Sequence, residues 1–341
     1  MKRLLMLTSV LLLVLFILPV ISIKGDSIAD LRAKEVFWGQ ISDRLAVESL
    51  ETGAVLFAKD SLVTVDVLIG DQITALPVDQ YLHGVLAAEV PATFPAEALK
   101  AQAVAARTYT AYKMKQTPPE QHKGAAVCSD YTHCKAYIEP LTAVESWGAP
   151  GIENMENIKR AVAETDGKIV TYDGKAIIAV FHSTSSGKTE QAADVWGSDI
   201  AYLKSVPSPG EDKSPGYYGK VELDKEEFKS AFLTLYSDAA FGEDAKSWFA
   251  NEKRSEAGGI ITIDVGGVTV KGTQIRSMCE LRSTNFTLDF SGNNIVFQTL
   301  GYGHGVGMSQ YGARELALEG KGFEQILKWY YTGCEIGMID N

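Results

Sequence analysis

Residues 77–115, PVDQYLHGVLAAEVPATFPAEALKAQAVAARTYTAYKMK, restrict the possible fold more than any other stretch of the chain. The segment predicts two helices interrupted at Pro91. Proline lacks a backbone donor and moves the preceding Val90 out of the helical region, so the first helix should end near Glu89. Pro95 suits the first turn of the second helix, where proline is tolerated. We therefore expect two consecutive helices separated by a short break.

The remainder of the chain mixes helices with short strands. VTVDVLIG at 63–70 alternates in polarity as a strand does. Residues 116–139 should form a loop and 154–164 a helix, and 168–172 and 175–182 should be strands. We then expect a polar loop at 183–199 and a charged, mainly helical stretch at 210–260. Short strands at 260–298, a glycine-rich loop at 301–313 and a last helix at 313–331 should follow. This pattern predicts an α+β fold with one body at 61–341 and an inserted lobe at about 210–260.

The N-terminus predicts a membrane anchor at 1–24. Lys2 and Arg3 precede a run of 20 uncharged residues, Leu4–Ile23, which is the length that a spanning helix needs. The leading basic residues stay on the cytoplasmic side, so a stalk at 25–60 and everything after it would lie outside. A cleaved secretory signal is the alternative, and it leaves the compartment unchanged.

The charge balance argues against nucleic acid as a partner. The formal net charge is −11 and no run of Lys and Arg occurs after the N-terminus, whereas phosphate binding depends on clustered basic residues. The 46% of hydrophobic residues suffices for one large core or two ordinary ones.

Glu89 is the side chain in the first helix that most needs an explanation. It follows Tyr81, Leu82, Val85 and Leu86 on one helical face, so it should point into the protein or a cleft. Burial and the negative end of the helix dipole both raise a carboxyl pKa, as a general acid requires. The alternative is a buried ion pair with Arg107.

Glu97 favours a structural interpretation instead. With Phe94 as the cap, Glu97 occupies the third helical position and can reach back to a free amide, as in a capping box.

HKGAAVCSDYTHC places His122, Cys128 and Cys134 in one loop. These residue types suit zinc, but the gaps are wider than the usual C-x₂₋₄-C spacing, and a Cys128–Cys134 disulfide is equally compatible. We expect His133 on the surface, because neighbours in sequence rarely both face one metal. Cys279 and Cys334 are expected as buried thiols, or as a pair.

Three blocks of the chain resemble the stage II sporulation protein D family: YLHGVLAAEVPATFPAEALKAQAVAARTYT at 81–110, FHSTSSGKTEQAADVWGSDIAYLKSVPSPGE at 181–211 and GYGHGVGMSQYGA at 301–313. The resemblance implies a membrane-anchored lytic transglycosylase of sporulation that cleaves peptide-stripped peptidoglycan glycan strands and leaves 1,6-anhydro sugars. It makes Glu89 the catalytic acid, and it implies a zinc ion on His122, Cys128 and Cys134, which we expect to be structural. A stem-peptide-stripping amidase and a membrane scaffold protein are the implied partners.

The polar loop at 183–199 and the glycine-rich loop at 301–313 supply candidates for binding a glycan, since hydroxyls, amides and aromatic rings are the groups that bind sugars. Lys188 could meet the lactyl carboxylate of muramic acid. Ordinary turns are the alternative for these loops, and neither a dinucleotide motif nor a serine-hydrolase elbow is present. The candidate substrate-binding residues are Arg107, Ser185, Ser186, Lys188, Gln191, Trp196, Tyr202, His304, Gln310 and Tyr311.

Two other functions are compatible with the sequence. The chain could bind glycan and enhance an amidase without cutting, as relatives in the wider family do by resemblance. It could also be a zinc amidase, although two thiolates weaken the Lewis acidity of a metal and no paired general base is evident nearby.

Overall fold

The computed structural model describes residues 59–339. The expected anchor at 1–24 and nearly all of the expected stalk lie outside this part of the chain. Within residues 59–339, none of the helices is both long enough and apolar enough to cross a membrane.

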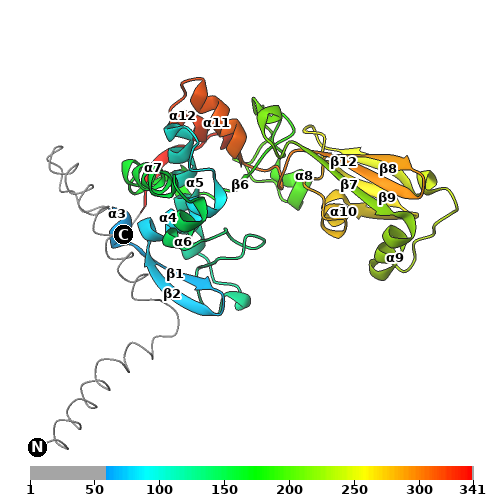
Figure 1. Cartoon of the computed structure of the whole chain (residues 1–341), viewed down its shortest axis with the longest axis horizontal. Helices are drawn as coiled ribbons and strands as arrows, with labels where there is room; N and C mark the ends of the chain where they lie inside the picture. Colours follow the sequence, from blue (N-terminus) through cyan, green and yellow to red (C-terminus); the bar gives the residue numbers. More distant parts are fainter. Residues whose placement is uncertain (1–58, 340–341) are drawn as a thin grey trace, which may run out of the picture. The chain divides into compact units, whose positions relative to one another are not determined.

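A group of helices builds most of the body (Figure 1). Helix α5 (Ala96–Met114) is central: it is buried along most of its length and contacts α4, α7, α11 and α12. Its alanines allow these neighbours to approach closely. The helices around it are α4 (Val78–Glu89), α6 (Pro140–Trp147), α7 (Gly151–Glu164), α11 (Gln310–Leu318) and α12 (Phe323–Tyr330).

The expected interruption between the first two helices is confirmed. Helix α4 ends at Glu89, and Val90 after it has extended backbone angles, as the residue before a proline should. Pro95 is the N-cap of α5. The break therefore leaves Glu89 in the last turn of α4.

Three small sheets complete the body. β1 (Thr64–Ile69) lies between β2 (Gln72–Pro77) and β3 (Val127–Cys128), antiparallel to the former and parallel to the latter. β4 (Lys168–Tyr172) pairs with β5 (Lys175–Ala176) and with the last strand, and β6 pairs with β13. The other bounds are β6 (Phe181–His182), β13 (Met308–Ser309), β14 (Glu335–Met338), α3 (Lys59–Leu62), α8 (Ala192–Trp196), η1 (Glu120–His122) and η2 (Glu211–Lys213).

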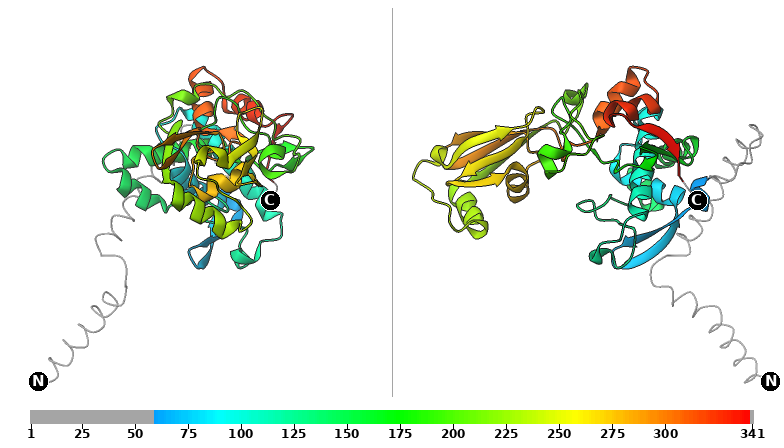
Figure 2. Two further views of the ribbon diagram at one scale, coloured as in Figure 1. Left: turned by 90° about the vertical axis from the view of Figure 1, so that its right-hand side faces the viewer. Right: turned by 180° about the vertical axis from the view of Figure 1, so that it is seen from behind.

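Residues 218–300, called the lobe below, form two three-stranded antiparallel sheets, β10-β9-β8 and β11-β12-β7. Helices α9 and α10 lie against these strands (Figure 2), and one hydrophobic core joins both sheets and both helices. The bounds are β7 (Tyr218–Asp224), α9 (Lys225–Leu235), η3 (Ala245–Trp248), β8 (Phe249–Arg254), β9 (Ile260–Val265), β10 (Val268–Lys271), α10 (Gly272–Met278), β11 (Phe286–Ser291) and β12 (Asn294–Leu300).

The lobe differs from the sequence expectation in two respects. The stretch at 245–255 was expected to be helical, but it forms η3 and β8, because pairing with β9 decides its conformation. The strands at 260–298 share the core of α9, so the compact unit extends about 40 residues beyond the expected end at 260.

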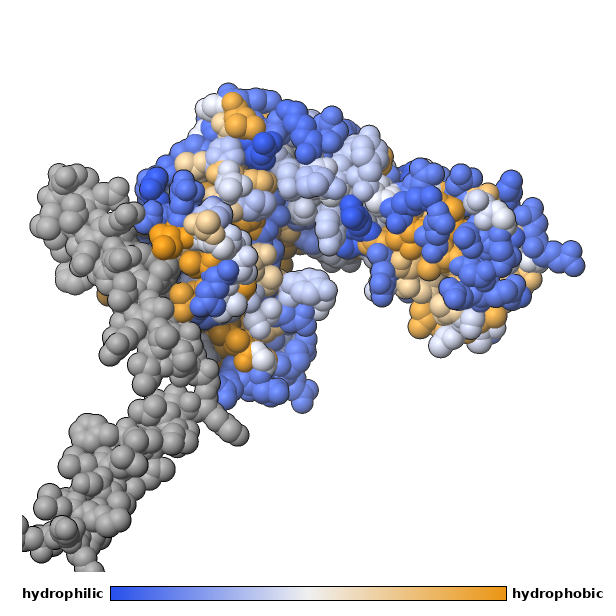
Figure 3. All heavy atoms as spheres, viewed as in Figure 1, coloured by the Kyte–Doolittle hydropathy of each residue, from blue (hydrophilic) through white to orange (hydrophobic). Residues whose placement is uncertain are grey.

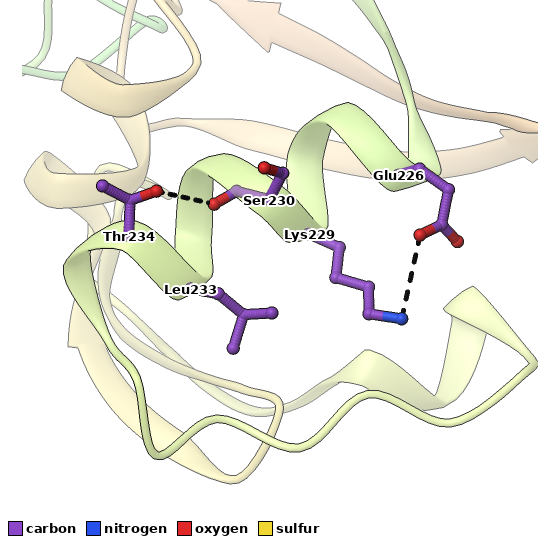
Figure 4. Close-up of a pocket in the computed structure, with 5 residues that line it drawn as sticks. All are labelled: Glu226, Lys229, Ser230, Leu233 and Thr234. Carbon is purple, nitrogen blue, oxygen red and sulfur yellow. Dashed lines mark hydrogen bonds and ion pairs between the residues drawn. The ribbon is translucent and has the colours of Figure 1, made fainter.

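Hydrophilic side chains cover much of the face shown in Figure 3, with separate hydrophobic patches between them. One open recess lies along α9 and is lined by Glu226, Lys229, Ser230, Leu233 and Thr234 (Figure 4). The Thr234 hydroxyl donates to the Ser230 carbonyl, and Lys229 pairs with Glu226. None of the expected site residues lines this recess.

Candidate active site around Glu89 and an adjoining metal-ligand cluster

The Glu89 carboxyl is partly buried at the end of α4. Its Oε1 accepts a hydrogen bond of 2.8 Å from the Ala136 amide. Burial raises the pKa of Glu89, while the charge of Lys135 and the Ala136 amide oppose that shift. The expected combination of partial burial and a raised pKa is therefore present at this position.

Lys135 is a neighbour of Glu89 that the sequence did not reveal. Only 7% of it is exposed, and its ammonium lies 3.5 Å from the centre of the Phe181 ring and 4.8 Å from that of Tyr109. Burial lowers the pKa of Lys135 to about 8, against the charge of Glu89. Its position depends on the fold of the loop after β3, which no local pattern indicates.

Two imidazoles and an indole form an aromatic group near Lys135. The His304 ring lies 5.6 Å from His182 and 5.4 Å from Trp196, which is 40% exposed. Burial lowers the pKa of His182 to about 4 and that of His304 well below its usual value, and in both cases the charge of Lys135 adds to the effect. Both rings are therefore neutral near pH 7.

The backbone explains why the two histidines approach each other. Gly303 has a φ of +118°, and a Cβ at this position would lie 2.7 Å from the Cβ of His182. Both the positive φ and the close approach to His182 require glycine at this position. The sequence had indicated His304 but not His182, which comes from β6.

Gln310, the first residue of α11, contacts the backbone of Glu89. Its Nε2 donates to the Glu89 carbonyl over 3.0 Å, so it holds the backbone of the carboxylate residue. Tyr311 packs edge-on against Phe94, with 5.1 Å between ring centres. Gln310, expected to bind substrate, thus lies beside Glu89 but bonds its backbone.

The other expected glycan-binding side chains have protein partners instead. Ser185 bonds Glu211, Ser186 donates to the Ala257 carbonyl, and Lys188 pairs with Glu256. Gln191 bonds Asp194, and the Tyr202 hydroxyl accepts from the Ile178 amide. These bonds hold the five side chains in their loops, and Ser185, Ser186 and Lys188 line a recess together with His304. Their binding of glycan stays a prediction.

Arg107 requires a correction. It is fully buried and forms an ion pair with Asp60, with Nη2 and Oδ2 2.6 Å apart. Its guanidinium also donates to the Val162 and Lys168 carbonyls. The expected alternatives, a pair with Glu89 or a contact with substrate, are both wrong, because every side of the guanidinium faces the interior.

Glu97 is structural, as expected, but not through a capping box. It occupies the second position of α5 and accepts from the Phe323 amide over 2.8 Å. Its carboxylate thus caps the start of α12, and it also pairs with Lys100.

The expected zinc ligands come together in the loop before Lys135. The ligand atoms of His122, Cys128, His133 and Cys134 all lie within 4.8 Å of one another. His133 is a correction, since it was expected on the surface but faces this cluster. All four cysteines of the chain, including Cys279 and Cys334, are free thiols, so neither of the two possible disulfides is formed.

The sulfur-to-nitrogen distances of the cluster fit a tetrahedral zinc ion, whereas Nε2 of His122 and Nδ1 of His133 lie 2.7 Å apart and would have to separate slightly to bind one ion. The sulfur atoms of Cys128 and Cys134 each lie 3.6 Å from Nδ1 of His133, and that of Cys134 lies 3.6 Å from Nε2 of His122. Zinc with ordinary bond lengths separates sulfur from nitrogen by about 3.5 Å. Nδ1 of His122 lies 3.1 Å from the Ala125 carbonyl, which orients the ring so that Nε2 faces the cluster.

The fold and the site together define an α+β protein with a raised-pKa glutamate beside a four-residue ligand cluster. A family model described as SpoIID, stage II sporulation protein, matches residues 70–172. Stage II sporulation protein D of Bacillus amyloliquefaciens is 37% identical over 291 residues, covering 85% of this chain and 83% of the relative. That of Bacillus subtilis is 38% identical over 266 residues, covering 78% and 76%.

A more distant relative, the amidase enhancer of Bacillus subtilis, is 27% identical over 306 residues, which are 75% of this chain and 40% of that protein. The chain belongs to the stage II sporulation protein D family, as its three sequence blocks predicted.

Proposed function

We propose that this protein is a lytic transglycosylase that cuts peptide-stripped peptidoglycan between N-acetylmuramic acid and N-acetylglucosamine during sporulation. The observation that carries the proposal is the Glu89 carboxyl, partly buried, with a raised pKa and a fixed bond to the Ala136 amide. Among the described residues, no second carboxylate contacts Glu89. A hydrolase that uses water needs two carboxylates, whereas attack by the sugar's own hydroxyl needs one.

In this reaction protonated Glu89 gives its proton to the glycosidic oxygen as the bond from that oxygen to C1 of the muramic residue breaks. The 6-hydroxyl of the same residue bonds to C1, and its proton passes to the Glu89 carboxylate. The products are a 1,6-anhydro end and a free 4-hydroxyl, and Glu89 regains its proton.

The aromatic group near Lys135 suits a sugar ligand. Neutral His304 offers a ring nitrogen for hydroxyl groups, and the exposed Trp196 beside it offers a flat face to a pyranose ring. Gln310 acts differently, because it fixes the Glu89 backbone. Trp196 and His304 are thus the parts of the expected binding loops that we assign to substrate.

We propose that His122, Cys128, His133 and Cys134 hold one structural zinc ion. When bound, zinc would cross-link the loop between β3 and Lys135. Four protein ligands complete a tetrahedral zinc site, so no position remains for a reactive water, and this argues against the zinc amidase.

The location and the partners belong to the same proposal. The apolar run at 4–23 would anchor the chain with its N-terminus in the cytoplasm and its body outside the membrane. An amidase that removes stem peptides would supply the substrate, and a membrane scaffold protein would hold the two enzymes together. Septal thinning and engulfment are the steps at which this activity would act.

A non-cutting enhancer of an amidase is the second candidate. The likeness to a protein named amidase enhancer favours it. In that case Glu89 and its neighbours would bind glycan without breaking it.

Mass spectrometry of peptide-free glycan strands incubated with the full-length protein tests these candidates. We expect fragments with anhydro ends from the wild type and none from Glu89→Gln. Glu97→Gln is the matched control, because its carboxylate caps α12, and it should still cut. Hydrolysed ends would exclude the lytic route, and binding without any fragments would favour the enhancer.

A further inference from the structure

We propose that the metal-ligand cluster positions the Glu89 carboxyl through residues 134–138, called the bridging segment below. The inference rests on the proposed role of Glu89 as the acid. It assigns the cluster a function beyond holding its own loop together, and it makes Ala136 a positioning residue.

The bridging segment reaches Glu89 through a backbone group. The Ala136 amide donates to Oε1 of Glu89 over 2.8 Å. It is the only hydrogen bond of the Glu89 side chain within residues 59–339, so this amide fixes the position of the carboxyl. A donor to a carboxylate also lowers its pKa.

Two further contacts hold the bridging segment against α4. The Ile138 amide donates to the Gly84 carbonyl over 3.3 Å, and the Tyr137 ring stacks on Tyr81, with centres 5.9 Å apart and 9° between the planes. Gly84 permits this approach, because a Cβ there would lie 2.3 Å from the Tyr137 ring and 2.6 Å from the Ile138 carbonyl oxygen.

The other end of the segment is a member of the cluster. Cys134 is two residues before Ala136, a length of chain that spans about 7 Å at most. The Cys134 amide donates to the Asp130 carbonyl over 2.7 Å, and Cys128 lies opposite Leu68 in the parallel pair of β1 and β3. A metal ion on the four ligands would therefore fix the bridging segment between the β1 sheet and α4.

The proposal has a consequence that a purely structural metal would not have. Losing the metal should release the Ala136 amide from Glu89 while α5, the central helix, stays folded. An acid that acts in the transition state then works less well with little change in substrate binding, so kcat falls and KM does not.

The first test uses amide hydrogen exchange of the full-length protein, measured by NMR with zinc bound and after chelation. We expect Ala136 to lose protection on chelation at least tenfold more than amides of α5, which serve as the internal reference. Equal protection of Ala136 with and without zinc would overturn the proposal, as would an equal loss at Ala136 and in α5. Amide exchange is measured without glycan substrate. A negative result can therefore be distinguished from an absence of the proposed lytic activity.

The second test is a double-mutant cycle between Ala136→Pro, which removes the donor, and Cys128→Ser, which weakens the cluster. We expect each change to lower kcat about tenfold, and the pair to lower it no more than either alone. Ala136→Ser keeps the amide and should keep kcat. Independent, multiplying losses in the double variant would contradict the coupling.

Discussion

At the scale of single residues, three influences set the acidity of Glu89. Burial raises its pKa, while the ammonium of Lys135 and the amide of Ala136 lower it. An acid that must also act as a base works best when its pKa lies near the working pH. The loop after the ligand cluster therefore supplies both of the groups that keep the pKa of Glu89 from rising further.

Replacing Lys135 with methionine should move the pH profile of cutting. Without the ammonium the pKa of Glu89 rises, and because the acid form of Glu89 starts the reaction, the basic limb of kcat should shift to higher pH. Methionine fills a similar space beside Phe181 and Tyr109. A basic limb at the wild-type pH would show that Lys135 does not act on Glu89.

Arg107 should matter for stability and not for cutting. It forms a fully buried ion pair with Asp60, and removing one partner of such a pair costs about 3–5 kcal/mol. We expect Arg107→Ala to lower the free energy of unfolding by that amount in urea titrations, with the kcat of the remaining folded protein unchanged. A stable variant with a raised KM would restore Arg107 to the substrate site.

At the scale of elements, four side chains and not three meet in the loop after β3, and we propose that all four bind zinc. His133→Ala should therefore reduce zinc affinity as severely as His122→Ala. Cobalt substituted for zinc makes the comparison direct, because tetrahedral cobalt absorbs strongly in the visible range. Unchanged tetrahedral absorption in His133→Ala would mean that His133 is not a ligand.

The elements also show what a sequence can and cannot predict. The end of α4 at Glu89 follows from a local rule, the effect of Pro91 on Val90, and it was predicted. The conformation of β8 depends on β9, a pairing that no local pattern contains. Local chemistry predicts an element when the partners are near in sequence.

The same distinction applies to the site. Glu89, His122, Cys128 and Cys134 could be singled out as candidates from short segments of the sequence. Lys135 gains its position only when the loop after β3 folds against Tyr109 of α5, and His182 only when β6 pairs with β13. The bonds that occupy Ser185 and Lys188 likewise come from Glu211 and Glu256, which are distant in sequence.

At the scale of the whole molecule, a buried carboxyl links several parts of the body. Glu211 is only 2% exposed; it accepts from the amide and hydroxyl of Ser185 and from Ser208, which also bonds the Tyr330 hydroxyl of α12. Burial raises the pKa of Glu211 to about 7, against the hydrogen bonds from the serines.

This carboxyl should make stability depend on pH. The folded state holds the Glu211 proton up to about pH 7 and the unfolded state only to about 4.5, so the contribution of Glu211 is complete below 4.5 and is lost as the pH rises to 7. Glu211→Gln, which stays neutral, should gain up to about 3 kcal/mol on the wild type between pH 5 and pH 8. Denaturant titrations at both pH values measure this, and a difference independent of pH would show that Glu211 is ionised throughout.

The bond between Gln310 and the Glu89 carbonyl joins residues 221 positions apart. A ribosome adds about 5–20 residues per second, so Glu89 exists for about 11–44 seconds before its partner is made. Throughout that interval the growing chain contains Glu89 but not Gln310, which fixes the Glu89 backbone. Strand β4 likewise has no β14 to pair with until the last strand is made. With the activity proposed above, the chain would therefore lack part of the support of its acid until synthesis is nearly complete.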